Sequence, residues 1–192
     1  MVIRPATRDD LPGILAIYND AVLNTTATAD YEPHTLEKRA RWFDDHARTN
    51  LPIFVAGDTA GRVVGWSSLS AYHGRVGYRF SVENSVYVAA DLRGRGIGKL
   101  LLPPLIEAGQ QLGLHVIIAS IDSSNEASLR LHASCGFEYA GRLREVFCKF
   151  GRWLDVITMQ RLLNDLPPLQ VETSITPCSA ARKQEETGRQ GA

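Results

Sequence analysis

The stretch Ser85-Val86-Tyr87-Val88-Ala89, followed by Arg93-Gly94-Arg95-Gly96-Ile97-Gly98, decides the fold of this chain. An extended run leads into a glycine-rich turn, and a segment with the apolar period of a helix follows. The first turn of such a helix has unpaired N–H groups and the positive end of the helix dipole. Glycines let a bulky anion approach these groups without meeting a Cβ atom. The order therefore predicts a diphosphate site, with added positive charge from Arg93, Arg95 and Lys99.

The spacing of the glycines excludes two familiar phosphate loops. A dinucleotide fingerprint needs G-x-G-x-x-G, whereas the glycines here fall at 94, 96 and 98. A P-loop needs Ser or Thr after its Gly-Lys pair, and Leu100 stands at that position. The pattern that fits is R-x-x-G-x-G, which resembles the acetyl-CoA diphosphate loop of the GNAT family of N-acetyltransferases.

Separate motifs extend this resemblance over nearly the whole chain, from about residue 3 to 163. The family's second signature resembles a spaced set of residues further along, namely Asn125, Ser128, His132 and Gly136-Phe137. The segments 82–88 and 149–155 are similar to one GNAT subfamily, the phosphinothricin and methionine sulfoximine acetyltransferases. The resemblance implies a GNAT domain over 1–163 that uses acetyl-CoA.

The composition excludes several classes of function. The chain has 192 residues, 44% of them hydrophobic, which is enough for one sizeable core. Lys plus Arg equals Asp plus Glu at 21 each, which argues against nucleic-acid or membrane partners. No run of about 18 apolar residues and no signal-like N-terminus is present. Cysteines without C-x-x-C spacing predict reduced thiols in the cytoplasm, and the scattered histidines predict no metal.

The apolar periods predict an α/β fold in the order β-α-α-β-β-β-α-β-α-β-β. The expected helices are one ending near 24, then 35–49, 96–112 and 125–135, and the expected strands are 2–4, 53–57, 63–71, 78–88, 115–121, 138–147 and 153–162. We expect a single mixed, mostly antiparallel, twisted sheet of about seven strands flanked by about four helices. Only the two strands joined by helix 96–112 should run parallel. Pro103-Pro104 predicts a bend in that helix, and 164–192 reads as a flexible tail.

Polar side chains alternate along the expected central strand 78–88. Period two places Arg79, Ser81, Glu83 and Ser85 on one face, whereas central strands are normally apolar on both faces. An acceptor pocket explains this face, with Glu83 taking a proton from the attacking amine directly or through a water. The alternative is a structural ion pair between Glu83 and Arg79.

The resemblance implies roles for further residues. A main-chain N–H exposed where two strands splay apart binds the developing oxyanion in the family, and it maps to Val88 or Tyr87. His132 stands where many members carry a tyrosine that protonates the leaving thiolate, the alternative being a histidine without chemistry. Asn125 bonds the pantetheine arm, caps its helix, or does both. The residues assigned to acetyl-CoA are Val86, Tyr87, Val88, Arg93, Gly94, Arg95, Gly96, Ile97, Gly98, Lys99, Asn125 and Ser128.

The acceptor implied by the resemblance is a small amino acid whose α-amine is acetylated. Its carboxylate meets an arginine, for which Arg79 matches the subfamily position, and a bidentate pair explains the choice over lysine. Members often have Arg-Pro at the His73-Gly74 position, so Arg75 would supply that charge from a shifted place. The acceptor candidates are therefore His73, Arg75, Arg79 and Glu83, and the identity of the amino acid stays open.

Two other functions fit the same residues. One is an acetyltransferase for a protein N-terminus or a drug amine, which the paired arginines disfavour. The other is a non-catalytic acyl-CoA sensor whose segment 164–192 engages a partner. A homodimer is implied by the resemblance alone.

Overall fold

A single seven-stranded sheet organises the described part of the chain, residues 1–164 of the computed structural model. The strands are β1 (Val2–Pro5), β2 (Ile53–Gly57), β3 (Val63–Ala71), β4 (Ser81–Val88), β5 (Val116–Asp122), β6 (Glu138–Lys149) and β7 (Arg152–Leu162). Their order in the sheet is β1-β2-β3-β4-β5-β7-β6. All neighbouring strands are antiparallel except β4 and β5. The predicted fold class and the single parallel pair are both confirmed.

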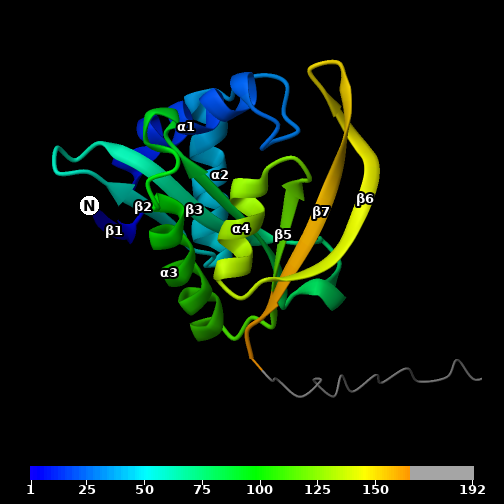
Figure 1. The fold of residues 1–192 in the computed structure, drawn as a ribbon. Coiled ribbons are helices and arrows are strands. Elements are labelled where there is room, and N and C mark those ends of the chain that lie inside the picture. Colours follow the sequence, from blue (N-terminus) through cyan, green and yellow to red (C-terminus); the bar gives the residue numbers. More distant parts are fainter. Residues whose placement is uncertain (165–192) are drawn as a thin grey trace, which may run out of the picture.

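In the described part of the chain, four helices cover the two faces of this sheet (Figure 1). They are α1 (Leu11–Asn24), α2 (Leu36–Thr49), α3 (Ile97–Gln111) and α4 (Glu126–Ser134), and single 3-10 turns occur at Arg8–Asp10, Val76–Tyr78 and Ala90–Leu92. Helices α1 and α2 lie on one face, and α3 and α4 lie on the other. The connection between the parallel strands β4 and β5 runs through α3, because parallel neighbours need a long crossover, which is usually a helix.

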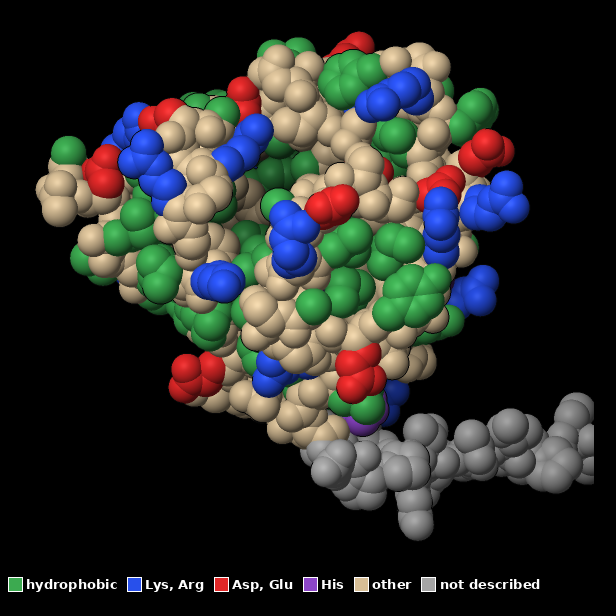
Figure 2. Space-filling view, in the orientation of Figure 1, with side chains coloured by type: hydrophobic (Ala, Val, Ile, Leu, Met, Phe, Trp, Pro, Cys, Tyr) green, Lys and Arg blue, Asp and Glu red, His purple; other side chains and the backbone are tan. Residues whose placement is uncertain are grey.

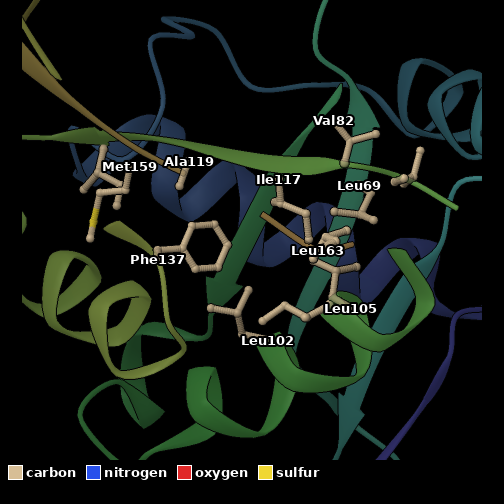
Figure 3. Packing of buried hydrophobic residues seen from close by; sticks show 12 residues of the cluster. Leu69, Val82, Leu102, Leu105, Ile117, Ala119, Phe137, Met159 and Leu163 are labelled. Atoms are coloured by element: carbon tan, nitrogen blue, oxygen red, sulfur yellow. The ribbon is translucent and has the colours of Figure 1, made fainter. Parts of the chain in front are cut away.

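The core follows the alternation of side chains along the strands. On β3, Trp66 packs with Ile14 and Ile17 of α1, while Leu69 points to the opposite face. There it joins the cluster of Leu102, Leu105 and Ile117, among others, that fills the space under α3 (Figure 3). Apolar burial on both faces of the central strands fixes the register of the sheet.

Strand β4 begins at Ser81, so the predicted start at 78 is wrong. Val76–Tyr78 form a 3-10 turn, and Arg79 continues it with helical dihedral angles, φ −58° and ψ −19°. Its amide is bonded to the Val76 carbonyl oxygen at 3.1 Å instead of joining the ladder. Arg79 therefore does not share the strand face of Glu83.

Helix α3 runs without interruption through Pro103 and Pro104. The carbonyl groups that lose their i+4 donors belong to Lys99 and Leu100, both on the exposed side of the helix. Water can take the place of the missing donors there, which explains why the helix tolerates the pair.

The predicted tail, 164–192, lies outside the described residues apart from Asn164. The side-chain amide of Asn164 donates to the Leu114 carbonyl oxygen at 3.1 Å. None of the described helices has the length and apolar character needed to span a bilayer.

Candidate functional site

The parallel strands β4 and β5 separate after only three residue pairs. Their ladder runs from Ser81 and Val116 to Glu83 and Ile118. Beyond it, β4 pairs only with β3 and β5 pairs only with β7. A wedge-shaped gap, here called the splay, therefore opens in the middle of the sheet.

Main-chain polar groups of every second β4 residue face this splay. The Ala89 amide donates to Val64 of β3, so the odd-numbered amides, including that of Tyr87, point to β3. The Phe80 carbonyl accepts from His115 on the β5 side, so the even-numbered residues point the other way. The amides of Val86 and Val88 consequently face the gap, where β5 no longer pairs with them.

The predicted glycine turn precedes α3 and leaves a set of amides free. Gly94 and Gly96 have φ of +77° and +81°, which glycine adopts at little cost. Within the described residues, the amides of 94–98 have no hydrogen-bond acceptor, whereas the Lys99 amide is bonded to Gly96 at 3.0 Å. A Cβ at Gly94 or Gly96 would meet no protein atom within 4 Å, so the space above both is open. This geometry suits an anion such as a diphosphate.

A cleft of about 860 Å³ extends from this turn and is called the glycine-loop cleft below. It is lined by most of 93–99, by the start of α4, by the segment after α1, and by Phe150 and Arg152. Figure 2 shows the recess in the upper half of the face, with Lys and Arg side chains at its border. Arg95, which was predicted to bind the cofactor, is exposed and does not line the cleft.

The positive charges of the cleft are not equivalent. Arg93 is held by an ion pair with Asp20 of α1 at 2.7 Å and by a bond from its Nε to the Val88 carbonyl at 3.2 Å. It thereby ties the glycine turn to α1 and to the end of β4. Lys99 and Arg152 form no ion pair within residues 1–164, so their charges remain available to an anion.

A second cavity of about 470 Å³ lies in the splay itself and is called the splay cavity. It adjoins the glycine-loop cleft, with which it shares six lining residues: Thr26, Ala27, Val86, Tyr87, Asn125 and Ser128. Glu83 lines the splay cavity from the end of the β4–β5 ladder. No ion pair joins Glu83 to Arg79 in the described part of the chain, because the Arg79 guanidinium bonds the Val76 carbonyl and packs on Phe80.

His132 is buried at the wall of the splay cavity, with 4% of its surface exposed. Its Nδ1 donates to the Ser128 carbonyl at 2.8 Å, and its Nε2 accepts from Asn84 Nδ2 at 2.9 Å. Burial lowers the pKa of His132 below its usual value. In this arrangement His132 is neutral and has no proton on Nε2.

Asn84 is a site residue that the sequence did not single out. It is 8% exposed and lines the splay cavity, and its Oδ1 has no hydrogen-bond partner. The available signal was an asparagine within an otherwise apolar strand face, between Val82 and Val86, where asparagine is disfavoured. An unpaired buried amide oxygen in a cavity wall is open to a donor from a ligand.

Asn125 and Asp122 shape the junction of the two cavities. Asn125 caps α4, because its Oδ1 accepts from the Ser128 amide at 3.1 Å. Asp122, at the end of β5, accepts from the Ser124 amide at 3.0 Å and from the Thr26 hydroxyl. The contact with Thr26 holds the segment after α1 against the splay, and no local sequence pattern indicates it.

The remainder of that segment is fixed by a partly buried polar network. Tyr18 of α1 donates to Asp30 at 2.6 Å, and burial together with Asp30 raises the pKa of Tyr18 to about 12. His34 also bonds Asp30, at 2.6 Å. Arg39 of α2 is 3% exposed and stacks its guanidinium 4.2 Å from the Tyr18 ring centre. The segment after α1 is therefore held to both α1 and α2.

The acceptor residues predicted from the sequence do not join the cavities. His73, Arg75 and Arg79 lie in the exposed connection between β3 and β4 and line neither cavity. The His73 ring accepts from the Arg75 amide at 3.2 Å. Of the four candidates, only Glu83 reaches the splay cavity in this chain.

Comparison with known proteins gives a consistent result. A family model described as acetyltransferase (GNAT) domain matches residues 3–158. An L-methionine sulfoximine/L-methionine sulfone acetyltransferase of Pseudomonas aeruginosa is 52% identical over 158 residues, 82% of this chain and 92% of that protein. A ribosomal-protein-alanine N-acetyltransferase from Brucella melitensis has a TM-score of 0.83 and 47% identity, covering 85% of this chain and 100% of that one. A phosphinothricin acetyltransferase from Sinorhizobium meliloti, in complex with AcCoA, has a TM-score of 0.85 and 36% identity, covering 94% and 98%.

Proposed function

Because the chain belongs to the GNAT family and is an acetyl-CoA-dependent N-acetyltransferase, we propose that its acceptor is a small amino acid of the methionine sulfoximine or phosphinothricin type. The observation that carries the proposal is that the glycine-loop cleft adjoins a splay cavity that is lined by Glu83. A donor and an acceptor can meet there without a covalent enzyme intermediate. The 52% identity with a methionine sulfoximine acetyltransferase supports this class of acceptor.

The residues around the glycine turn fit acetyl-CoA, which supplies an activated acetyl group when bound. The free amides of 94–98 and the open space above Gly94 and Gly96 suit its diphosphate. Lys99 and Arg152 add charge. Arg93, being paired with Asp20, acts mainly by positioning the turn and the Val88 carbonyl.

The amide that meets the negative charge developing on the acyl oxygen faces the splay, which favours Val86 or Val88 over Tyr87. Val88 is five residues from Glu83, about 16 Å along the strand, whereas Val86 is about 10 Å away. The attacking amine has to reach both Glu83 and the acyl carbon. We therefore assign the charge-stabilising amide to Val86, and the Val88 amide to the extended arm of the coenzyme.

Glu83 accepts the proton from the ammonium of the acceptor, directly or through one water, because an ammonium has no lone pair for attack. Its half-buried position at the end of the ladder keeps the carboxylate at the border of the splay cavity. Asn84 and His132 approach the cavity from the opposite face of the sheet. For His132 to protonate the leaving thiolate, its Nε2 must first gain a proton and release the Asn84 amide.

The acceptor's carboxylate is assigned to Arg75 and Arg79, with His73 beside them, although these residues lie outside the cavities of this chain.

We propose that a homodimer completes the site. Large apolar side chains on β6 and β7 are at least half exposed, namely Tyr139, Leu143, Val146 and Trp153. Figure 2 shows apolar side chains gathered over these strands, as at a subunit interface. Light scattering on the purified protein measures this, and a monomer at micromolar concentration contradicts it.

Thiol release in the presence of acetyl-CoA tests the acceptor class. The panel contains free amino acids, their sulfoximine, sulfone and phosphinate analogues, and a peptide with N-terminal alanine. We expect the analogues to be acetylated and Glu83→Gln to lower kcat by about 10²- to 10⁴-fold, with the affinity for acetyl-CoA unchanged. Preferred acetylation of the peptide would favour the activity for which the Brucella melitensis protein is named. Acetyl-CoA binding without any acetylation would favour a sensor.

A further inference from the structure

One bulky residue of the chain has a backbone conformation that disfavours it. Among the described residues, three non-glycine residues have positive φ: Asn50 (54°), Glu145 (51°) and Phe150 (51°). Asparagine tolerates the left-handed region, whereas a large aromatic side chain there is an outlier. Phe150 is 53% exposed, so burial in the core does not compensate the strain.

Phe150 is the first residue of the tight turn between β6 and β7. Lys149 and Arg152 are paired across the hairpin, and Phe150 and Gly151 both have positive φ, at 51° and 70°. Two-residue turns of this kind strongly prefer Asn-Gly or Asp-Gly, because both central residues are left-handed. The glycine follows that preference and the phenylalanine violates it.

Contacts on both sides force the hairpin tip into this position. Lys149 is 2% exposed, and its Nζ donates to the Thr28 carbonyl at 2.8 Å. The Tyr31 hydroxyl donates to the Cys148 carbonyl. Figure 1 shows the tip beside the segment that follows α1. These contacts hold the Phe150 ring at the glycine-loop cleft, which it lines together with Arg152.

Strain that persists at a site wall is characteristic of function. We propose that Phe150 is a binding residue for the uncharged pantetheine arm of the coenzyme, an inference that rests on the proposed function. The hairpin is fixed to the rest of the molecule at Thr28 and at Ser123, whose amide donates to the Asp155 carbonyl at 2.9 Å. The free amides and Lys99 belong to the glycine turn, a separate wall of the cleft. The Phe150 ring lines the cleft and offers apolar contact there, which suits the uncharged arm between diphosphate and thioester.

Phe150→Asn separates binding from folding, because it gives the turn its preferred residue and removes the ring. The melting temperature should rise by about 2–4 °C through loss of the strain. The KM for acetyl-CoA should increase about 5- to 30-fold, with kcat at saturation unchanged. With acetyl-pantetheine, which lacks the nucleotide, the kcat/KM of Phe150→Asn should fall by the same factor. Phe150→Tyr keeps the ring and should keep the wild-type KM.

Glu145→Asn is the matched control. Glu145 has the same φ, lies on the same hairpin and lines neither cavity. Its replacement should raise the melting temperature and leave the KM for acetyl-CoA unchanged.

Three results would overturn the inference about Phe150. They are an unchanged KM in Phe150→Asn, a lower melting temperature in that variant, and a loss seen with acetyl-CoA but not with acetyl-pantetheine, which would move the contact to the nucleotide. Calorimetry on the wild type keeps the proposed function separate. If the wild type does not bind acetyl-CoA, the proposed function fails before any variant is compared.

Discussion

Replacing Asn84 with leucine should change the free energy of unfolding by less than about 1 kcal/mol. The side chain donates to His132 Nε2 at 2.9 Å, and both residues are buried. Removing the donor leaves Nε2 unpaired, which costs about 1–3 kcal/mol. The same change removes Asn84 Oδ1, which already lacks a partner and carries a penalty of similar size. Leucine has the same heavy-atom branching as asparagine and is somewhat larger, so no cavity results.

His132→Leu should behave differently, because it leaves both ends of the Asn84 amide unpaired. We expect a loss of about 1–3 kcal/mol from this variant, and most of it should be recovered in the Asn84→Leu/His132→Leu double variant, where both partners are apolar. Urea denaturation of the four proteins at pH 7.5 gives the complete double-mutant cycle. A loss above about 2 kcal/mol in Asn84→Leu would refute the reasoning, since it would mean that Oδ1 is satisfied in the native protein.

Three further predictions concern the same region. Burial lowers the pKa of His132 and His46, so the folded state disfavours their protonation. Stability should be full above about pH 6.5 and fall by up to about 1.4 kcal/mol per pH unit for each below it. Urea titrations at pH 7.5 and 5.5 measure this, and His46→Gln should flatten the slope. Gly96→Ala should cost about 1–2 kcal/mol and weaken acetyl-CoA binding in calorimetry at least tenfold, whereas Gly61→Ala, with φ +82° and equal open space, should cost the same and leave binding unchanged. Asp122→Ala should speed proteolysis of the segment after α1, and an unchanged cleavage rate would show that this contact is dispensable.

The parts of the site that sequence reasoning found are those encoded within one short segment. The glycine turn is such a segment, because its spacing, its positive charges and the helix that follows are all local. The cap at Asn125 was foreseeable for the same reason. The wrong start of β4 also has a local cause, since one 3-10 turn at Val76–Tyr78 removed Arg79 from the expected face.

The parts of the site that the sequence did not predict depend on contacts between residues that are distant in sequence. Asn84 and His132 are 48 residues apart, and Thr26 and Asp122 are 96 apart. Neither contact leaves a periodic signal in the chain. The direction of the Val86 and Val88 amides follows only from the register of β4 against β3, and the strain of Phe150 only from its dihedral angle.

The short ladder between β4 and β5 has a mechanical consequence. Within residues 1–164, three residue pairs are the only strand pairing between the half of the sheet formed by β1 to β4 and the half formed by β5 to β7. Such a seam is weaker than any other junction of the sheet, where at least four pairs are made. A ligand that bonds the free edge of β4 while touching α4 stabilises the junction between the two halves of the sheet. Hydrogen exchange at Ser81–Glu83 should therefore slow when the site is filled.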